Sequence, residues 1–177
     1  MLLPKDYRKG LDTIEMEYPW IIKSSIDFLE TKLTKNMEVL EFGCGGSTFF
    51  YAKRCKSVVG FETNKEWYEK IQKFIKLRKI KNVTVHFVKN RYESIPIIAG
   101  KKFDVIMVDC DPGAMSRINI MRQVRSVNAK DKCMIVLDNY GYSYCGKSDT
   151  ILSGYKVNTF NDEPWDGVGT KVYMKGW

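Results

Sequence analysis

Acidic side chains stand at or next to the ends of four apolar runs in this sequence. They are Glu41, Glu62, Asp109 and Asp138. Carboxylates in such positions can hold ribose hydroxyls, orient a polar ligand or bind a divalent cation. Each run reads as a β-strand, and open α/β sheets bind ligands beyond the carboxyl ends of their strands. We therefore expect these carboxylates to contribute to one site.

A glycine-rich turn follows the first of these runs. Residues 37–47 read MEVLEFGCGGS, an apolar strand whose glycines let the backbone turn tightly and approach a ligand closely. Ser47 and Thr48 can cap the helix that begins there. A strand, a glycine turn and a helix N-terminus together present backbone N–H groups to a bound molecule.

The second run, residues 57–61 (SVVGF), ends at Glu62. Nucleotide-binding α/β folds place at this point a carboxylate that holds two ribose hydroxyls. A dinucleotide fingerprint would need a third glycine where Thr48 stands, and it usually has an apolar residue where Glu41 stands. A carboxylate at position 41 instead suits a ligand that carries an ammonium group and a sulfonium charge.

At these positions the sequence resembles the class I S-adenosylmethionine-dependent methyltransferases. Their first motif is (D/E)-x-G-x-G, matched by residues 41–45 (EFGCG), and their second is the acidic residue that closes the next strand, matched by Glu62. The chain from Tyr18 onward also resembles a small group in that superfamily with the motifs PWI, EFGxGGST, LDN and GTxxxxK. The resemblance implies an α/β fold with a doubly wound, mostly parallel seven-stranded sheet that ends in an antiparallel hairpin.

The same resemblance implies that S-adenosylmethionine is the cofactor and predicts the residues that bind it. These are Glu41, Gly43, Cys44, Gly45, Ser47, Thr48, Glu62, Thr63, Asn90, Arg91 and Asp109. Asn90 follows the third strand, residues 82–88, where methyltransferases of this class commonly place an acidic or amide residue against the adenine amino group.

The fourth strand, residues 102–109 (KFDVIMVD), is a nearly continuous apolar run of the kind buried on both faces of a parallel sheet. It ends at Asp109, which we expect beside the transferable methyl group, orienting or deprotonating the acceptor. Asp111 and Tyr140 are predicted to assist it in catalysis.

The fifth strand, residues 132–137, is followed by Asp138 and Asn139. With Asp109 these side chains offer three oxygen ligands at adjacent strand ends, which suits Mg²⁺. Catechol O-methyltransferase-like enzymes resemble this arrangement, although they usually carry a lysine base where this chain has Pro112. The alternative is that positions 138 and 139 only stabilise a turn.

The other patterns indicate how the chain is organised. Residues 1–36 contain an amphipathic stretch at 18–33 (YPWIIKSSIDFLETKL) that predicts a helix covering a sheet edge or forming part of a lid. Residues 37–177 form the cofactor-binding domain, and residues 155–160 and 168–174 predict its terminal hairpin. We expect one compact domain overall.

The formal charge of +8 suits nucleic acid, phosphorylated substrates or anionic surfaces. Much of the excess lies on a helix between Asn64 and Lys81, whose lysines we interpret as a solvated face. No apolar run approaches the roughly 20 residues that span a bilayer, and we expect a cytoplasmic protein without a membrane partner. The five cysteines form no C-x-x-C pair, which argues against a disulfide framework or a zinc site.

The favoured prediction is an S-adenosylmethionine-dependent O-methyltransferase that acts on a hydroxyl of a small molecule or glycan. A nucleic-acid methyltransferase is an alternative, supported by the charge and weakened because Asp109 does not begin a (D/N)-P-P-(Y/F) motif. A non-catalytic module that binds the cofactor is another. The oligomeric state is left open.

Overall fold

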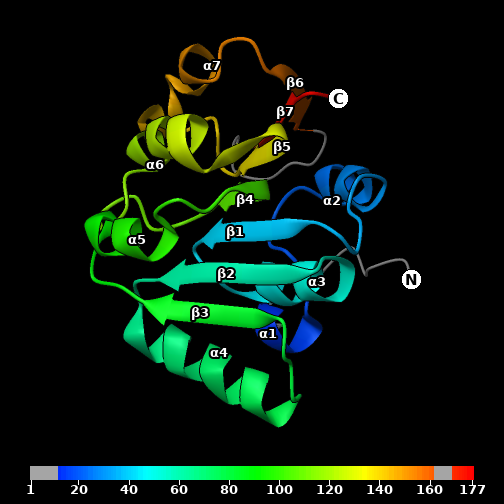
Figure 1. The fold of residues 1–177 in the computed structure, drawn as a ribbon, viewed down its shortest axis with the longest axis vertical. Coiled ribbons are helices and arrows are strands. Elements are labelled where there is room, and N and C mark those ends of the chain that lie inside the picture. Colours follow the sequence, from blue (N-terminus) through cyan, green and yellow to red (C-terminus); the bar gives the residue numbers. More distant parts are fainter. Residues whose placement is uncertain (1–11, 162–168) are drawn as a thin grey trace.

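The computed structural model describes residues 12–161 and 169–177. Seven strands form one sheet in the order β3-β2-β1-β4-β5-β7-β6. The strands are β1 (Glu38–Phe42), β2 (Ser57–Glu62), β3 (Val83–Phe87), β4 (Phe103–Val108), β5 (Ala129–Leu137), β6 (Lys156–Phe160) and β7 (Thr170–Lys175). The first five are parallel and β7 runs antiparallel to both β5 and β6, which confirms the predicted sheet and its terminal hairpin (Figure 1).

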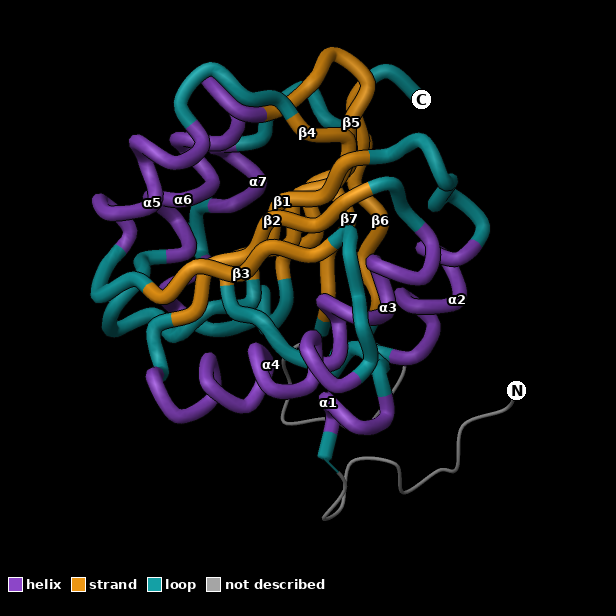
Figure 2. Tube along the Cα trace, turned by 60° about the horizontal axis from the view of Figure 1, so that its bottom comes forward, coloured by secondary structure: helices purple, strands orange, loops and turns teal. Residues whose placement is uncertain are grey.

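Helices cover both faces of the sheet (Figure 2). They are α1 (Thr13–Met16), α2 (Lys23–Glu30), α3 (Gly46–Arg54), α4 (Lys65–Leu77), α5 (Arg91–Ile98), α6 (Arg117–Gln123) and α7 (Ser148–Ile151). The first four pack on one face and the last three on the other. This two-sided cover is what a doubly wound sheet requires, because its strands are apolar on both faces.

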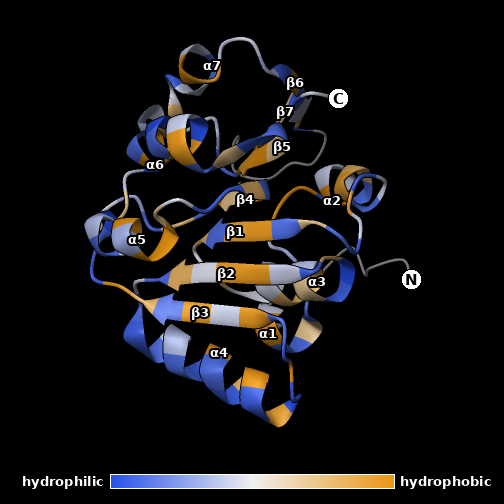
Figure 3. Ribbon diagram, viewed as in Figure 1, coloured by the Kyte–Doolittle hydropathy of each residue, from blue (hydrophilic) through white to orange (hydrophobic). Residues whose placement is uncertain are grey.

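The strand β4 shows how the sequence produces these two layers. Val105 and Met107 belong to the core beneath α1 to α4, while Ile106 and Val108 belong to the core beneath α5 to α7. All four side chains are fully buried. Successive side chains of a strand point to opposite faces, so a continuous apolar run is buried on both sides. Hydrophobic residues also lie along β1, β2 and β3 (Figure 3).

The N-terminal helix is shorter than predicted. The stretch expected to be helical over residues 18–33 is helical only in α2, and a separate short helix, α1, precedes it. Ile21 and Ile22 are buried, and the Ile22 backbone N–H donates to the Thr170 hydroxyl of β7 over 3.3 Å. This tie holds the chain in a non-helical path before α2 begins.

Two other boundaries also differ. The helix predicted after the fourth strand is α6 followed by a π-helical turn, Val124–Asn128, and β5 then begins at Ala129, earlier than predicted. Most of the predicted hairpin connection, residues 161–167, lies outside the described residues, as do residues 1–11 of the predicted lid segment. Every helix that the structure describes is too short or too polar to cross a membrane.

Candidate functional site

A cavity of about 220 Å³ lies at the carboxyl ends of β1, β2 and β4. Its lining consists of Thr13, Trp20, Gly43, Cys44, Gly45, Gly46, Ser47, Glu62, Trp67, Asp109 and Asp111. β2, the next strand in the chain, pairs with one edge of β1, whereas β4 pairs with the other edge. Such a reversal of strand order is where open α/β sheets bind ligands.

The glycine turn brings β1 close to β4. Gly43 has a φ of +84°, and a Cβ atom there would lie 2.2 Å from the backbone oxygen of Asp109. The Gly43 backbone N–H donates to the Phe61 carbonyl of β2 over 2.9 Å. Gly46 at the start of α3 is similarly crowded, since a Cβ would lie 2.0 Å from the Tyr18 carbonyl oxygen. Only glycine fits at these two positions without displacing backbone.

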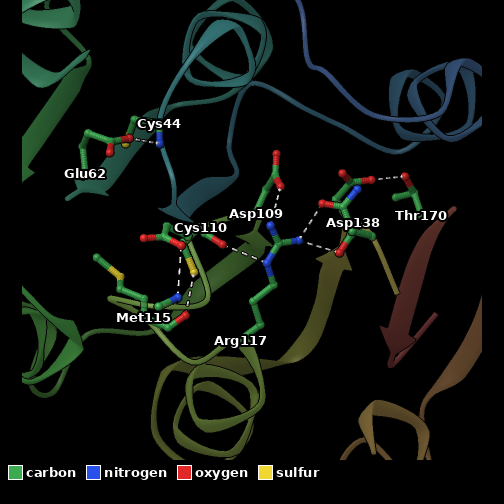
Figure 4. Close-up of polar contacts among 11 residues, drawn as sticks. Cys44, Glu62, Asp109, Cys110, Met115, Arg117, Asp138 and Thr170 are labelled. Atoms are coloured by element: carbon green, nitrogen blue, oxygen red, sulfur yellow. Dashed lines mark hydrogen bonds and ion pairs between the residues drawn. The ribbon is translucent and has the colours of Figure 1, made fainter. Parts of the chain in front are cut away.

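Glu62 is held in the cavity wall by backbone donors. One of its carboxylate oxygens accepts from Cys44 N–H over 3.1 Å (Figure 4). The other accepts from Thr63 and Asn64 N–H over 2.8 and 2.7 Å. The side chain is 7% exposed. A carboxylate has about four acceptor positions, so three backbone bonds orient it and leave capacity for a ligand hydroxyl.

Glu41 lies beneath the turn and outside the cavity lining. It is fully buried, and one oxygen accepts from the Thr48 hydroxyl over 2.5 Å while the other has no hydrogen-bond partner in the described chain. Burial raises the pKa of Glu41 to about 8, and the charges of Asp109 and Glu62 add to this effect. The carboxyl group is therefore largely protonated at neutral pH.

Thr48 also lies beneath the turn. Its hydroxyl accepts from the Gly45 backbone N–H over 3.0 Å as well as donating to Glu41, so it caps α3 as predicted. It is fully buried and does not line the cavity.

Trp67 lies on the helix predicted between Asn64 and Lys81 and lines the cavity, although it was not among the predicted site residues. Its indole N–H donates to the Cys44 carbonyl over 2.6 Å, and its ring lies 3.8 Å from where a Cβ of Gly45 would be. Asn64 caps α4 by accepting from the Trp67 backbone N–H over 3.0 Å. An aromatic residue in the first turn of the helix after Glu62 is the signal that could have indicated this position.

Asn90, predicted to meet the adenine, and Arg91, predicted to bind the cofactor, do not line the cavity. The Asn90 side chain caps α5 by accepting from Tyr92 N–H over 2.9 Å. The Arg91 guanidinium lies 4.2 Å from the centre of the Tyr92 ring. Thr63 contributes its backbone N–H to Glu62 and is likewise absent from the lining.

Arg117, which the sequence analysis missed, joins the ends of β4 and β5. Its Nε donates to the Cys110 carbonyl over 2.9 Å, and one terminal nitrogen donates to Asp109 Oδ1 over 3.0 Å. The other terminal nitrogen donates to the Asp138 carbonyl over 2.7 Å and to Asn139 Oδ1 over 3.2 Å (Figure 4). The arginine is 5% exposed. No sequence motif connects it to these partners, which come from two separate loops.

The predicted magnesium site is therefore not supported. Asp109, Asp138 and Asn139 do come together, but they surround a guanidinium group. The Asp138 carboxyl accepts from the Thr170 hydroxyl over 2.6 Å, and burial together with the charge of Asp109 raises the pKa of Asp138 to about 8. No group of three His, Cys, Asp or Glu side chains in residues 12–161 and 169–177 could hold a metal ion. The residues present do not fit a divalent cation, because the position between them is filled by a positive charge.

The predicted acceptor residues divide into two groups. Asp109 and Asp111 line the cavity, and Asp111 accepts from the Gly113 N–H over 3.0 Å. Burial raises the pKa of Asp109 to about 6, while Arg117 acts to lower it. Tyr140 is outside the lining, and its ring lies 4.6 Å from the Lys171 ammonium group.

A family model described as a methyltransferase domain matches residues 33–154. No curated protein matches the sequence.

Several solved structures share the fold. A Klebsiella pneumoniae protein assigned as an O-methyltransferase has a TM-score of 0.71 at 15% identity, covering 93% of this chain and 88% of its own. A Streptococcus mutans protein assigned as a methyltransferase, solved in complex with SAH, has a TM-score of 0.65 at 16% identity. The match covers 86% of this chain and 96% of that protein. An rRNA methylase from Streptococcus thermophilus has a TM-score of 0.63 at 12% identity. The match covers 85% of this chain and 92% of that protein.

Proposed function

This chain belongs to the methyltransferase domain family, and from that premise we propose that it transfers a methyl group from S-adenosylmethionine to a hydroxyl of a small molecule or sugar. The enzyme class and the Rossmann-like fold predicted from the sequence are confirmed by the family match and the shared fold. The observation that carries the proposal is the pair of carboxylates, Glu62 and Asp109, that line one cavity at the strand ends.

The charge of the cavity supports S-adenosylmethionine as the donor. Glu62, Asp109 and Asp111 line it, although the whole chain has a formal charge of +8. S-adenosylmethionine supplies an electrophilic methyl group on a cationic sulfonium, and it also carries an ammonium group. An acidic cavity in a basic protein favours such a ligand electrostatically.

Each part of the cavity has a separate task in this proposal. Glu62, oriented by its three backbone donors, accepts hydrogen bonds from ribose hydroxyls. The turn at Gly43 and Gly45 lets the ligand approach the backbone, and the Trp67 ring beside Gly45 supplies apolar contact.

Asp109 is the proposed acceptor-side residue. One of its oxygens is bonded to Arg117, and the other points away from the guanidinium (Figure 4). Because the pKa of Asp109 is about 6, its carboxylate is mostly ionised at neutral pH and can accept a proton from the attacking hydroxyl. S-adenosylmethionine would supply the methyl group, and Asp109 would hold the proton that the acceptor hydroxyl gives up. Asp111, at the same wall, can orient the acceptor.

The test is transfer of labelled methyl groups from S-adenosylmethionine to fractionated hydroxyl compounds, with Asp109→Asn and the exposed Asp131→Asn as matched variants. We expect transfer to a small-molecule fraction that falls about 100-fold or more in Asp109→Asn, the usual range for loss of a general base, and is unchanged in Asp131→Asn. Equal transfer by both variants would exclude Asp109 as the base.

A nucleic-acid acceptor is the second candidate. The exposed lysines of α4 include Lys73 and Lys76, for which the described residues show no ion pair, and one structure of similar fold is an rRNA methylase. Labelled transfer to RNA or DNA, with binding that falls steeply as salt is raised, would favour this acceptor over a small molecule.

The cellular location is proposed on the state of the cysteines. All five are unpaired and buried, as expected for a protein of a reducing compartment such as the cytoplasm.

A further inference from the structure

The cluster at the ends of β4 and β5 contains a cation that belongs to the chain itself. We infer that Arg117 is a positioning residue that takes the place of a divalent metal ion, so that this methyltransferase fixes its acceptor-facing carboxylate with a guanidinium group and works without a metal. The inference goes beyond the proposed function, on which it rests only in that Asp109 faces the cofactor cavity.

The hydrogen bonds of Arg117 use most of its donors. A guanidinium group has five N–H bonds in a rigid planar fork, and four hydrogen bonds leave it here, from all three nitrogens. Two go to the loop after β4 and two to the loop after β5. The fork thus holds the two loops in one fixed relation, as a bridging metal ion would.

The turn after β4 and the start of α6 place Arg117 between the two loops. Met115 N–H donates to the Asp111 carbonyl over 2.9 Å, which closes the turn after β4. Ser116 caps α6 by accepting from Asn119 N–H over 3.4 Å. Arg117 is the first residue of α6, so its side chain reaches back toward the strand ends. The Tyr144 ring, 5.6 Å from the guanidinium, covers it on another side.

A metal ion and this arginine exclude each other. An ion bound by Asp109 Oδ1 and Asn139 Oδ1 would meet the guanidinium that already donates to both oxygens. A metal ion and the guanidinium group, bound to the same two oxygens in a buried setting, would repel each other strongly. Burial of Arg117 is tolerated because Asp109 supplies the opposite charge and two carbonyls accept its other protons.

The consequence for the cavity is a fixed orientation of Asp109. Arg117 is 5% exposed, whereas the Asp109 side chain is 28% exposed. The arginine therefore acts on a bound ligand through the aspartate. Its removal would leave the carboxylate free to rotate and would change how the cavity distinguishes a cationic ligand from a neutral one.

The first arm of the test measures Mn²⁺ binding to the intact chain by electron paramagnetic resonance, with Asp109→Asn alongside. We expect no bound Mn²⁺ up to about 1 mM, the weak end of oxygen-ligand sites. A Mn²⁺ site in the wild-type chain that disappears in Asp109→Asn would overturn the inference. This measurement needs neither the cofactor nor a known acceptor. It therefore shows whether a divalent cation binds beside Asp109 even if the proposed function is wrong.

The second arm measures the affinities for S-adenosylmethionine and S-adenosylhomocysteine in a double-mutant cycle of Arg117→Met and Asp109→Asn. The two ligands differ in charge at the sulfur, so the ratio of their affinities reports on the carboxylate. We expect each single variant to change this ratio by about threefold or more, and the double variant to match Asp109→Asn within about twofold. Independent, additive changes would mean that Arg117 is only structural, and would overturn its positioning role.

Two further variants control for folding. Arg117→Lys keeps the charge but cannot bridge both loops, so we expect it to shift the ratio in the same direction as Arg117→Met. Arg122→Met removes an exposed arginine from the same helix, whose side chain donates to Asn119 Oδ1 over 3.1 Å, and should leave the ratio unchanged. A shift in Arg122→Met as large as in Arg117→Met would contradict the inference.

Discussion

The two halves of the site hold their carboxylates in different ways. On the β2 side, Glu62 is held by backbone N–H groups of the glycine turn and of the residues that follow it in the chain. On the β4 side, Asp109 is held by the side chain of Arg117, which also reaches the loop after β5. Any residue except proline supplies a backbone N–H donor, so the turn alone is sufficient at Glu62. A side-chain donor such as the one at Asp109 requires one particular residue on another element.

This difference predicts how each half responds to substitution. The β2 half should depend on backbone conformation and tolerate changes in neighbouring side chains. The β4 half should depend on single side chains. The predictions below test this contrast, beginning with the glycine that joins the two halves.

Gly43→Ala should have the largest effect, a loss of about 3 to 4 kcal/mol in the free energy of unfolding. The new Cβ would meet the Asp109 carbonyl oxygen at 2.2 Å, and the residue has a φ of +84°. Gly100→Ala is the matched control, because its φ is +73° but no atom lies within 4 Å of the new Cβ. It should cost only about 1 kcal/mol. Denaturant unfolding measures both, and equal losses would refute the close contact of β1 with β4.

Glu62→Ala should weaken binding of S-adenosylmethionine about 100-fold, which corresponds to about 2.7 kcal/mol. The substitution removes the ligand contact and leaves three backbone N–H groups without their acceptor. Glu66→Ala removes an exposed acidic residue from the first turn of α4 and should change the affinity less than twofold. Quenching of the fluorescence of Trp67, which lines the cavity, can follow the binding. Comparable affinities in the two variants would remove Glu62 from the site.

Thr170→Val should lower the free energy of unfolding by about 1.5 kcal/mol. The hydroxyl donates to Asp138 over 2.6 Å and accepts from Ile22 N–H over 3.3 Å, and valine keeps the volume but loses both bonds. Thr159→Val on the exposed face of β6 is the control, with an expected change below about 0.5 kcal/mol. An unchanged stability in Thr170→Val would mean that this side chain does not support the β5 loop.

The pH dependence should extend the comparison, because two buried acids next to the site have a pKa raised to about 8: Glu41, which lies in β1, and Asp138, which follows β5. Between the ordinary carboxyl pKa and about 8, the native state binds more protons than the unfolded state. Stability from these groups is complete at low pH and is lost as the pH rises through 8. Between pH 7 and 8 each should contribute a decrease of about 1 kcal/mol.

Glu41→Gln and Asp138→Asn should each remove one of these two decreases, as measured by thermal or denaturant unfolding at several pH values. Asp131→Asn changes a fully exposed carboxyl. It should leave the dependence of the free energy of unfolding on pH as it is in the wild type. A slope that stays the same in both buried-site variants would show that neither acid is protonated in the native chain.

The sequence information about the β2 half is local. A strand, three glycines and an acidic residue after the next strand are contiguous signals, and they place Gly43 and Glu62 in the cavity wall. The parallel sheet followed from apolar runs such as β4 that are buried on both faces.

The β4 half was predicted only in part, because its key contact is not local. Asp109, Asp138 and Asn139 do meet at the strand ends, but what they bind depends on a side chain from α6. The oxygen ligands alone suggested a metal, and nothing in the pattern around Arg117 distinguishes it from a surface arginine. Glu41 illustrates the same limit, since its depth beneath the turn follows from packing against Thr48.

Calorimetric titration of the wild-type chain with S-adenosylmethionine is the most direct test of the central claim. We expect one site per chain with a dissociation constant in the micromolar range, equivalent to roughly 8 kcal/mol of binding free energy. No detectable heat at millimolar ligand, with the chain shown to be folded, would contradict it, because the acidic cavity at the strand ends would then serve some other ligand.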